Sequence, residues 1–224
     1  MINKKIGNEI NLLKNYPITP RDLNSRSAHK TEEDKKIARE FGKDFFDGER
    51  RHGYGGFNYN PKYWTQVISD IIEYYKLKDG SKILDIGCGK GFMLYDFLRA
   101  NPKIEVHGID ISSYAIKNCL PEVKNYVTVG NARQLNFADN SFDLVISINT
   151  LHNLKLDECK KAFKEVSRVS KSHSFIIVDA YRNIEEKKRM ESWNLTALTY
   201  MSTEEWKLLF AEVVYTGDYY WFIP

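Results

Sequence analysis

Short apolar runs alternate with longer stretches of helical periodicity through most of the 224-residue chain. Short apolar runs that are bounded by turn residues predict buried strands. The predicted strands lie at 83–86, 104–109, 125–129, 142–148 and 174–178. The helices predicted between them lie at 92–100, 112–120 and 155–169. Because strands that alternate with helices form parallel sheets, the pattern predicts an α/β fold.

Helical patterns also precede this alternating region. Residues 31–48 predict one helix, because Ile37, Phe41 and Phe45 recur every four residues behind a start that resembles a capping box. Pro61 predicts the first turn of a second helix, whose apolar face would lie against the sheet. The polar residues before 31 predict a short helix followed by irregular chain.

The stretch from Ile83 to Gly91 reads ILDIGCGKG, a buried strand followed at once by three alternating glycines. Glycines let the backbone turn sharply and let a ligand lie against it. Asp110 ends the next strand about 20 residues after the turn, where a ribose-binding acid is expected. Since open α/β sheets bind ligands at the carboxyl ends of their strands, this unit predicts a nucleotide-like ligand.

The glycine spacing separates the classes of nucleotide ligand. Phe92 stands where the dinucleotide motif G-x-G-x-x-G needs its third glycine, and a phosphate loop would need Ser or Thr after Lys90. Asp85 to Gly91 instead form D-x-G-x-G-x-G, which resembles the first motif of the class I S-adenosylmethionine-dependent methyltransferases. The resemblance implies a Rossmann-like, doubly wound, mostly parallel sheet and S-adenosyl-L-methionine as cofactor. A dehydrogenase-like or sugar-nucleotide-binding Rossmann domain is the alternative.

The resemblance also assigns residues to the cofactor. Asn131 follows the third strand, where the family usually carries an acid that accepts a hydrogen bond from the adenine amino group. Its amide oxygen can still accept that bond, at neutral rather than charged strength. Asn149 ends the fourth strand, where the transferred methyl group should lie. The residues expected to bind the cofactor are Asp85, Gly87, Cys88, Gly89, Gly91, Asp110, Ile111, Asn131, Ala132 and Asn149.

The C-terminal region predicts a cover for the site and the last part of the sheet. Residues 190–200 predict a helix over the site, and the run that begins at Ser202 has the signature of a helix start. Residues 213–222 predict one more strand. The family generally ends with two antiparallel strands, so whether a complete seventh strand exists stays open.

Residues 48–64 hold four glycines and four Tyr or Phe residues among basic and amide side chains. Two interpretations stay open, a solvated linker and a lid whose glycines act as hinges and whose rings exclude water. The position favours the lid, because in many small-molecule methyltransferases that this chain resembles, the segment before the first strand covers the site. Arg51 and Tyr54 of this segment are predicted to bind the substrate.

Transfer to a hydroxyl group benefits from a base, because a hydroxyl is a poor nucleophile near neutral pH. His152 follows the fourth strand, and imidazole titrates near neutrality, so it is the first candidate base. The interpretation that His152 only packs in a loop stays open beside it. His52 in the lid segment is the second candidate. Tyr181 and Arg182, after the fifth strand, are predicted to bind the substrate.

The sequence lacks the motifs that are typical of enzymes acting on other classes of methyl acceptor. Residues 149–152 have no prolines where enzymes that methylate the exocyclic amines of bases resemble [DN]-P-P-[YFW]. None of the three cysteines is placed to act as a nucleophile on cytosine. Asp179 alone is insufficient for metal-assisted transfer, so no metal is predicted.

Charge and cysteine usage narrow the class of protein. The net charge is +3, and the basic surplus lies in residues 1–60, with 12 basic and 9 acidic side chains. This balance argues against a nucleic-acid acceptor, because such proteins show a strong basic face. Three well-separated cysteines predict a reducing cytoplasm without disulfides or zinc. No apolar run approaches the ~20 residues that span a bilayer, so no membrane partner is expected.

The sequence thus predicts a cytoplasmic methyltransferase with a helical N-terminal cap and lid over residues 1–76 and a cofactor-binding core over residues 77–224. We expect methyl transfer to a hydroxyl group of a small molecule, such as a sugar or phosphorylated precursor of a bacterial surface polysaccharide or secondary metabolite. The alternatives are an N-methyltransferase on a small amine, an RNA methyltransferase and a non-catalytic S-adenosylmethionine-binding protein. The sequence does not indicate an oligomeric state.

Overall fold

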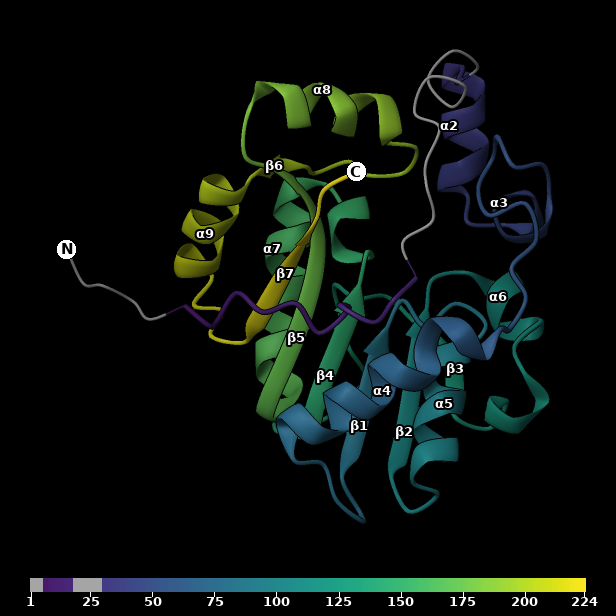
Figure 1. The fold of residues 1–224 in the computed structure, drawn as a ribbon, viewed down its shortest axis with the longest axis vertical. Coiled ribbons are helices and arrows are strands. Elements are labelled where there is room, and N and C mark those ends of the chain that lie inside the picture. Colours follow the sequence, from purple (N-terminus) through teal and green to yellow (C-terminus); the bar gives the residue numbers. More distant parts are fainter. Residues whose placement is uncertain (1–5, 18–29) are drawn as a thin grey trace.

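A seven-stranded sheet forms the centre of the protein (Figure 1). The structure, a computed structural model, describes residues 6–17 and 30–224. The strand order is β3-β2-β1-β4-β5-β6, and β7 also pairs with β5. Every pairing between named strands in the described ranges is parallel. The strands are β1 (Lys82–Ile86), β2 (Glu105–Asp110), β3 (Val127–Val129), β4 (Phe142–Ile148), β5 (Ser170–Tyr181), β6 (Met201–Ser202) and β7 (Asp218–Phe222).

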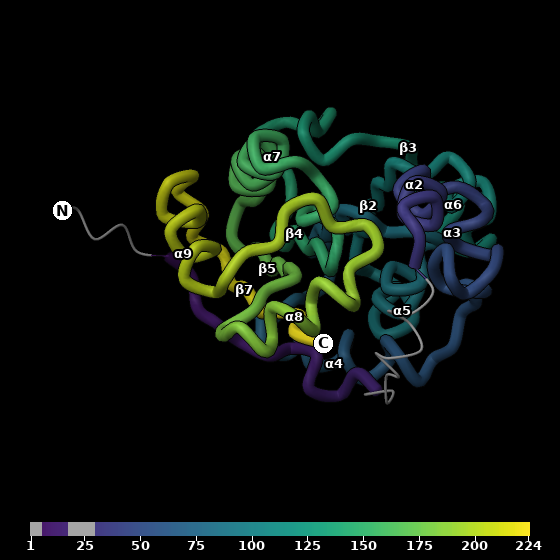
Figure 2. The backbone as a smooth tube through the Cα atoms, turned by 90° about the horizontal axis from the view of Figure 1, so that it is seen from above, coloured from purple at the N-terminus to yellow at the C-terminus, as the bar shows by residue number. Residues whose placement is uncertain are grey.

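Helices cover both faces of the sheet, as Figure 2 shows from above. On one face α4 and α5 bury Ile68, Ile71 and Phe97, and on the other α7 and α9 bury Phe163 and Trp206. The prediction of a doubly wound, mostly parallel α/β sheet is confirmed. The α-helices are α2 (Glu32–Arg39), α3 (Lys43–Asp47), α4 (Pro61–Tyr75), α5 (Phe92–Ala100), α6 (Ser113–Lys117), α7 (Leu156–Val169), α8 (Ile184–Trp193) and α9 (Thr203–Glu212), and the short 3-10 helices are η1 (Pro121–Val123) and η2 (Leu151–Asn153).

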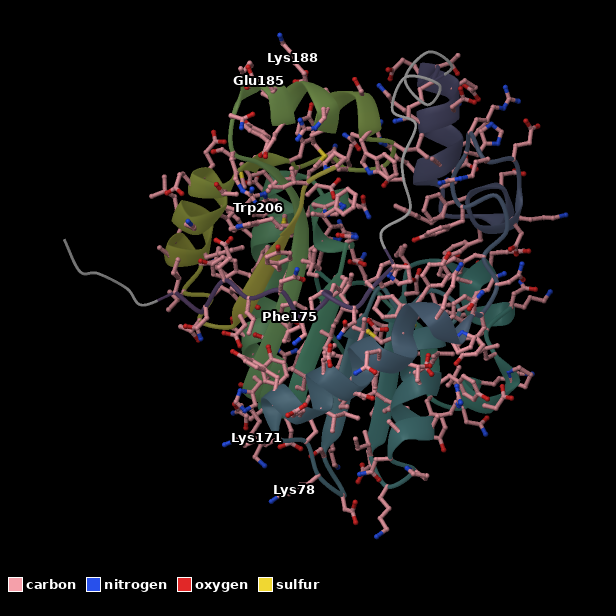
Figure 3. The ribbon with its side chains drawn as sticks, in the orientation of Figure 1. Lys78, Lys171, Phe175, Glu185, Lys188 and Trp206 are labelled. Atoms are coloured by element: carbon pink, nitrogen blue, oxygen red, sulfur yellow. The ribbon has the colours of Figure 1, made fainter. Side chains whose placement is uncertain are left out.

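The carboxyl ends of the strands point toward α2 and α3 on one side and α8 on the other (Figure 1). Lys171, at the start of β5, lies at the opposite end of the molecule from Glu185 and Lys188 of α8 (Figure 3). The chain order reverses between β1 and β4, since β2 and β3 extend the sheet from β1 and β5 extends it from β4. Ligands of such sheets bind at this reversal, above the strand ends.

Several predicted boundaries are confirmed. Both α5 and β4 have the predicted bounds, and Pro61 occupies the first turn of α4 behind an Asn60 cap. Ser112 caps α6 and Ser202 caps α9, each by accepting a hydrogen bond from a backbone N–H of the first turn. Both α6 and β3 are shorter than predicted.

The single helix predicted over residues 31–48 is wrong. A capping box between Thr31 and Asp34 starts α2, but α2 ends at Arg39 and a second helix begins at Lys43. Phe41 between them has a φ of 49°, in the left-handed region, which interrupts the helix. The Phe41 carbonyl oxygen accepts from the Ser112 hydroxyl after β2, so a tertiary contact lies where the helical period would continue.

The helix predicted over residues 190–200 is also wrong in position. It is α8, which starts behind Asn183, whose side chain accepts a hydrogen bond from the Glu186 N–H. At its other end the Lys30 ammonium group donates to the carbonyl oxygens of Ser192 (2.6 Å), Trp193 and Asn194 (3.2 Å). A cation at a helix carboxyl end satisfies free carbonyl groups and complements the helix dipole.

The end of the sheet differs from the expectation of two antiparallel strands. Both β6 and β7 pair with β5 in parallel, and β7 begins only at Asp218 rather than at 213. Strand β5 already starts at Ser170, so Lys171 to His173 lie in the strand rather than in a loop before it. The seven-stranded sheet is therefore complete without an antiparallel pair.

The first described residues run along the last strand. Glu9 bridges Tyr219 in parallel, and the Ile10 N–H donates to the Tyr219 carbonyl oxygen at 2.9 Å. Residues 6–17 contain no helix. The short first helix is predicted before residue 31, and residues 1–5 and 18–29 of that stretch lie outside the described residues. Within the described ranges, no helix is long and apolar enough to cross a membrane.

Candidate active site

A cavity of about 1240 Å³ lies at the carboxyl ends of β1, β2 and β4. Ligand pockets typically enclose roughly 300–1,000 Å³, so this cavity is large enough for two small molecules. The predicted site residues that line it are Asp85, Gly87, Cys88, Gly89, Asp110, Ile111, Asn131, Ala132, Asn149, His152, Arg51 and Tyr54. Four others, Gly91, His52, Tyr181 and Arg182, do not line it.

Three glycines with positive φ form the turn after β1, at 86° for Gly87, 54° for Gly89 and 77° for Gly91. A Cβ atom on Gly87 would lie 2.1 Å from Thr150 Oγ1, and one on Gly91 would clash with a side chain of η1. A Cβ atom on Gly89 would lie 3.2 Å from the Phe57 ring. The protein's own packing thus requires two of the glycines, whereas Gly89 faces the cavity and the N-terminal segment above it.

Two buried carboxyl groups, Asp85 and Asp110, lie beside this turn. Asp110 Oδ2 accepts from the Gly89 N–H at 2.7 Å, and Oδ1 accepts from the Ser112 N–H at 2.8 Å. Burial raises the pKa of Asp110 although both bonds oppose it, and burial together with Asp110 raises the pKa of Asp85 well above its usual value. Neither forms an ion pair with a basic side chain in the described chain. A cation bound here would favour the ionised form of both.

The ends of β3 and β4 supply Asn131 and Asn149. Asn131 Oδ1 accepts from both the backbone N–H and the Nε of Arg133, each at 3.0 Å. Arg133 is held in turn by an ion pair with Glu158. An adenine amino group would therefore have to share this oxygen with Arg133. Asn149 has a φ of 54°, a conformation that asparagine tolerates better than most residues and that often occurs at functional sites.

His152 is buried at the wall of the cavity and contacts the end of β5. Its Nδ1 accepts a hydrogen bond from the Asp179 N–H at 3.0 Å, and its Nε2 lies 3.6 Å from Asp179 Oδ1. Burial lowers the pKa of His152, although the Asp179 carboxylate opposes the shift. A neutral ring that accepts at Nδ1 carries its proton on Nε2, so in this arrangement His152 donates rather than accepts a proton.

The second candidate base, His52, lies away from the cavity. It is buried beneath α2, where its Nε2 is 3.1 Å from Asp34 Oδ1. Tyr181 and Arg182 lie outside the lining as well, with Tyr181 donating to Glu205 at 3.4 Å and Arg182 lying 3.8 Å from Glu186. Among residues 6–17 and 30–224, no group of three or more His, Cys, Asp and Glu side chains could hold a metal ion.

The segment between α3 and α4 is tied directly to the glycine turn. Lys90 is buried, and its Nζ donates to both carboxylate oxygens of Asp47 (2.8 and 2.7 Å) and to the Phe57 carbonyl oxygen (2.9 Å). Asp47 also accepts from the Phe57 N–H and from the Tyr114 hydroxyl. Burial alone would raise the pKa of Asp47, but the bonds from Lys90, Phe57 and Tyr114 outweigh it and lower the pKa.

Aromatic rings continue this contact above the turn. The Phe57 ring stacks on Phe92 at 4.7 Å and lies 4.2 Å from the Tyr54 ring. Ser112, which follows β2, donates through its hydroxyl to the Phe41 carbonyl oxygen. Arg51 of the same segment is half exposed and pairs with Glu49 at 3.0 Å. The segment thus covers the part of the cavity that the predicted cofactor residues line.

Sequence reasoning missed several residues that line the cavity. Arg39 comes from the end of α2, and its buried Nε has no hydrogen-bond partner in the described structure. Trp64, Asp179 and Trp193 also line the cavity, although they lie on segments that the sequence presents as core or cover. Lys90 was also missed: it contacts Asp47 rather than lining the cavity, and its place inside the glycine turn makes it a candidate to bind a neighbouring segment or a ligand.

The family model described as Methyltransferase domain matches residues 77–220. The chain therefore belongs to this methyltransferase family, and the prediction of a class I S-adenosylmethionine-dependent methyltransferase is confirmed. S-Adenosylmethionine is the methyl donor of the class.

Curated relatives differ in their acceptors. The tRNA (carboxymethyluridine(34)-5-O)-methyltransferase of Arabidopsis thaliana is 35% identical over 145 residues, which cover 64% of this chain and 33% of that protein. The phosphoethanolamine N-methyltransferase of Plasmodium falciparum is 26% identical over 173 residues, which cover 75% of this chain and 60% of that protein. The matches span 33% to 44% of the length of the first three relatives.

Solved structures share the fold. The YcgJ protein of Bacillus subtilis matches with a TM-score of 0.54 at 21% identity, over 65% of this chain and 66% of that one. The phosphoethanolamine N-methyltransferase 2 of Haemonchus contortus, in complex with phosphomonomethylethanolamine and S-adenosylhomocysteine, matches with a TM-score of 0.53 at 21% identity, over 87% of this chain and 45% of that one. At these identities the likeness concerns the fold alone.

Proposed function

We propose that the protein transfers a methyl group from S-adenosylmethionine to a hydroxyl group of a small molecule. The observation that carries this proposal is the pair of buried carboxyl groups, Asp85 and Asp110, beside the positive-φ turn at Gly89. Their chemistry fits a ligand with cationic groups and a ribose diol, and S-adenosylmethionine has both. Space for an acceptor lies in the same cavity.

The cofactor would be held by residues at four strand ends. Asp110 would accept from the ribose hydroxyls, and the backbone at Gly89 leaves room for the ligand to lie close. Asn131 and Ala132 would border the adenine, and Asn149 would border the reacting methyl group. When bound, the cofactor supplies a sulfonium methyl group: the acceptor oxygen forms the new C–O bond while the electron pair of the C–S bond stays on sulfur.

The hydroxyl proton needs an acceptor near the end of β4. His152 holds its own proton on Nε2 in the present arrangement, and that nitrogen faces Asp179. The Asp179 carboxylate would therefore take the hydroxyl proton, and His152 would hold that carboxylate in place. This assignment keeps His152 in the reaction but replaces the base role predicted from its sequence position.

The boundary between cap and core, predicted at residue 76, would lie earlier in the chain. Helix α4 buries Val67, Ile68 and Ile71 in the same core as the sheet, so it belongs with the core. The cap would then comprise residues 30–60, which Lys90 and Ser112 hold over the strand ends. Residues 48–60 would act as its lid. A cytoplasmic location stays a prediction that rests on the cysteine usage.

The acceptor is a small molecule in this proposal, and N-methylation of a small amine is the second candidate. Its support is the similarity to the phosphoethanolamine N-methyltransferase of Plasmodium falciparum over 75% of this chain. A sugar or phosphorylated acceptor has support from Arg39 and Arg51 at the cavity wall, whereas Tyr181 and Arg182 lie outside it.

The test combines calorimetry with a turnover assay. S-Adenosylmethionine should bind the wild type, and release of S-adenosylhomocysteine should accelerate with hydroxyl acceptors more than with amines or tRNA. Changing His152 to Ala should lower the turnover rate by about 100-fold or more, the scale of acid–base catalysis, and leave cofactor affinity within about twofold. Changing Asp179 to Asn should do the same. Undiminished turnover in either variant would remove that residue from the reaction.

A further inference from the structure

Outside residues 30–60, five large aromatic side chains line the cavity and are only half buried. In contrast, Trp206 and Trp221 are at most 4% exposed in the core. Half-buried rings around a cavity leave apolar area that a flat ligand can cover. The five residues, called here the aromatic wall, are Tyr16, Tyr63, Trp64, Trp193 and Phe222.

The wall is assembled from four separate chain segments. The Tyr16 ring lies 5.3 Å from the Tyr63 ring and 5.1 Å from the Trp64 ring, both on the first turn of α4. The Trp193 ring at the end of α8 lies 5.7 Å from the Phe222 ring at the end of β7. These centroid distances are within the range of aromatic contacts. The fold, rather than one local motif, thus gathers the rings at one cavity.

The strand register places one end of the wall close to the predicted methyl position. Phe222 of β7 lies opposite Asp179 of β5, and Ile177 of β5 lies opposite Ile148 of β4, the residue before Asn149. Neighbouring strands are about 4.8 Å apart, so the end of β7 is roughly 10 Å from the end of β4. A molecule of one or two fused rings on the wall can therefore reach the end of β4.

We infer that the aromatic wall binds the methyl acceptor and that this acceptor is a planar aromatic alcohol, a phenol or a fused-ring relative. The inference rests on the proposed function. Leu13, Met93 and Ile148 add apolar surface to the lining, which favours a flat ring over a sugar, although polar side chains such as those of Asn60, Asn194 and Thr196 line the same cavity. Aromatic faces also attract ammonium groups, but a permanent cation would be repelled by the sulfonium of the donor in the same cavity.

The step balances without a further reactant. A lone pair of the phenol oxygen forms the bond to the methyl carbon, and the bond from that carbon to sulfur breaks with its electron pair on sulfur. The phenolic proton passes to the Asp179 carboxylate, which lines the cavity at the end of β5. The products are an aryl methyl ether and the neutral thioether S-adenosylhomocysteine.

Calorimetry with 2-naphthol in the presence of S-adenosylhomocysteine tests the inference, and mass spectrometry checks for 2-methoxynaphthalene when S-adenosylmethionine is supplied. The wild type should bind 2-naphthol, and Trp64→Ala and Trp193→Ala should each weaken this binding at least tenfold. Trp64→Phe, which keeps a ring, should weaken it less. S-Adenosylhomocysteine affinity should stay within twofold in all three. Tyr126→Ala is the matched control, because Tyr126 is exposed outside the cavity lining.

The outcomes separate two failures. If the wild type binds S-adenosylhomocysteine but not 2-naphthol, or binds choline or methyl glucoside more tightly than 2-naphthol, the inferred acceptor class is overturned. If 2-naphthol binds equally well to wild type and to both Trp→Ala variants, the wall is not its site. If S-adenosylhomocysteine does not bind the wild type, the proposed function itself falls.

Discussion

The glycine turn and the cap face each other across one cavity, but they are built in different ways. The turn is made by backbone, since its glycines have positive φ and its N–H at Gly89 donates to Asp110. The cap is held by side chains, chiefly through Lys90 and Asp47. The first depends on a few consecutive residues and the second on contacts across the chain. The glycine turn is thus fixed locally, whereas the cap that covers it depends on tertiary packing.

The largest effect is expected from a substitution in the glycine turn itself. Changing Gly89 to Val adds a branched side chain at a φ of 54° and pushes it toward the Phe57 ring, where the ligand must also lie. Cofactor affinity measured by calorimetry should fall at least about 1000-fold, or ~4 kcal/mol, while the sheet still folds.

A matched control separates strain from blocked space. Gly80 has a φ of 77°, but nothing lies within 4 Å of where its Cβ would be. Changing Gly80 to Val should therefore cost stability without changing cofactor affinity. Equal loss of affinity in the two variants would mean that the Gly89 effect comes from the backbone rather than from the site.

The next largest effect is expected from a substitution that removes a contact between the cap and the glycine turn. Changing Lys90 to Met leaves Asp47 without its cation and removes three hydrogen bonds. Breaking a buried ion pair costs about 3–5 kcal/mol, and because Asp47 is partly exposed we expect roughly 2–3 kcal/mol of lost stability in denaturant unfolding. Amide hydrogen exchange should accelerate within residues 41–60.

Changing Lys103 to Met gives the comparison for an exposed pair. Lys103 lies 2.7 Å from Asp79, but both side chains are more than half exposed, so the loss of stability should be much smaller than in the Lys90 variant. Similar losses in the two lysine variants would show that the Lys90 contact does not hold the cap.

A smaller effect concerns the acid at the end of β2. Changing Asp110 to Ala should weaken S-adenosylmethionine by ~1.5–3 kcal/mol, the range for a hydrogen bond to a charged group. Because Asp110 also accepts from the Gly89 N–H, the variant should show faster exchange of that amide. Unchanged affinity in calorimetry would mean that the ribose contact is assigned to the wrong acid.

The smallest expected effect is a pH-dependent gain in stability. Because the pKa of Asp85 is raised by burial and by Asp110, the folded protein holds this proton more tightly than the unfolded chain. The stabilisation from this proton is present in full below the pKa of Asp85 in the unfolded chain. It is lost as the pH rises through the pKa of Asp85 in the folded protein. Changing Asp85 to Asn should therefore raise ligand-free stability at pH 7 and weaken cofactor binding.

Thermal melting from about pH 4 to pH 8 measures this difference. The gain of the Asp85 variant over wild type should shrink toward the acid end, where both chains carry a neutral group. A gain of the same size at every pH would mean that ionisation of Asp85 does not limit stability.

The sequence predicted the sheet, the turn and most strand ends, because hydrophobic period and glycine spacing are local signals. Both α5 and β4 have the predicted bounds, and Asp110 lies where its spacing requires. The break at Phe41 was missed because helical period continues through it, and the contact made there, from the Ser112 hydroxyl to the Phe41 carbonyl oxygen, comes from a distant part of the chain.

The residues of the acceptor side could not be predicted in the same way. Tyr16 and Trp64 meet across 48 positions of sequence, and Trp193 and Phe222 across 29, so no spacing rule connects them. His152 was predicted from its position after β4. Which of its ring nitrogens carries the proton, however, depends on the N–H of Asp179, which lies in another strand. Local patterns thus locate residues near the chemistry, and tertiary contacts decide their roles.

The pairing of Glu9 with Tyr219 has a consequence for how the chain acquires its structure. Residues 8–10 lie beside a strand that is synthesised about two hundred positions later, so this edge of the sheet cannot close on a growing chain. Contacts between such distant positions carry a loop-closure cost and slow folding. The early segment must therefore wait unpaired while the centre of the sheet forms, and its docking on β7 should be among the last events of folding.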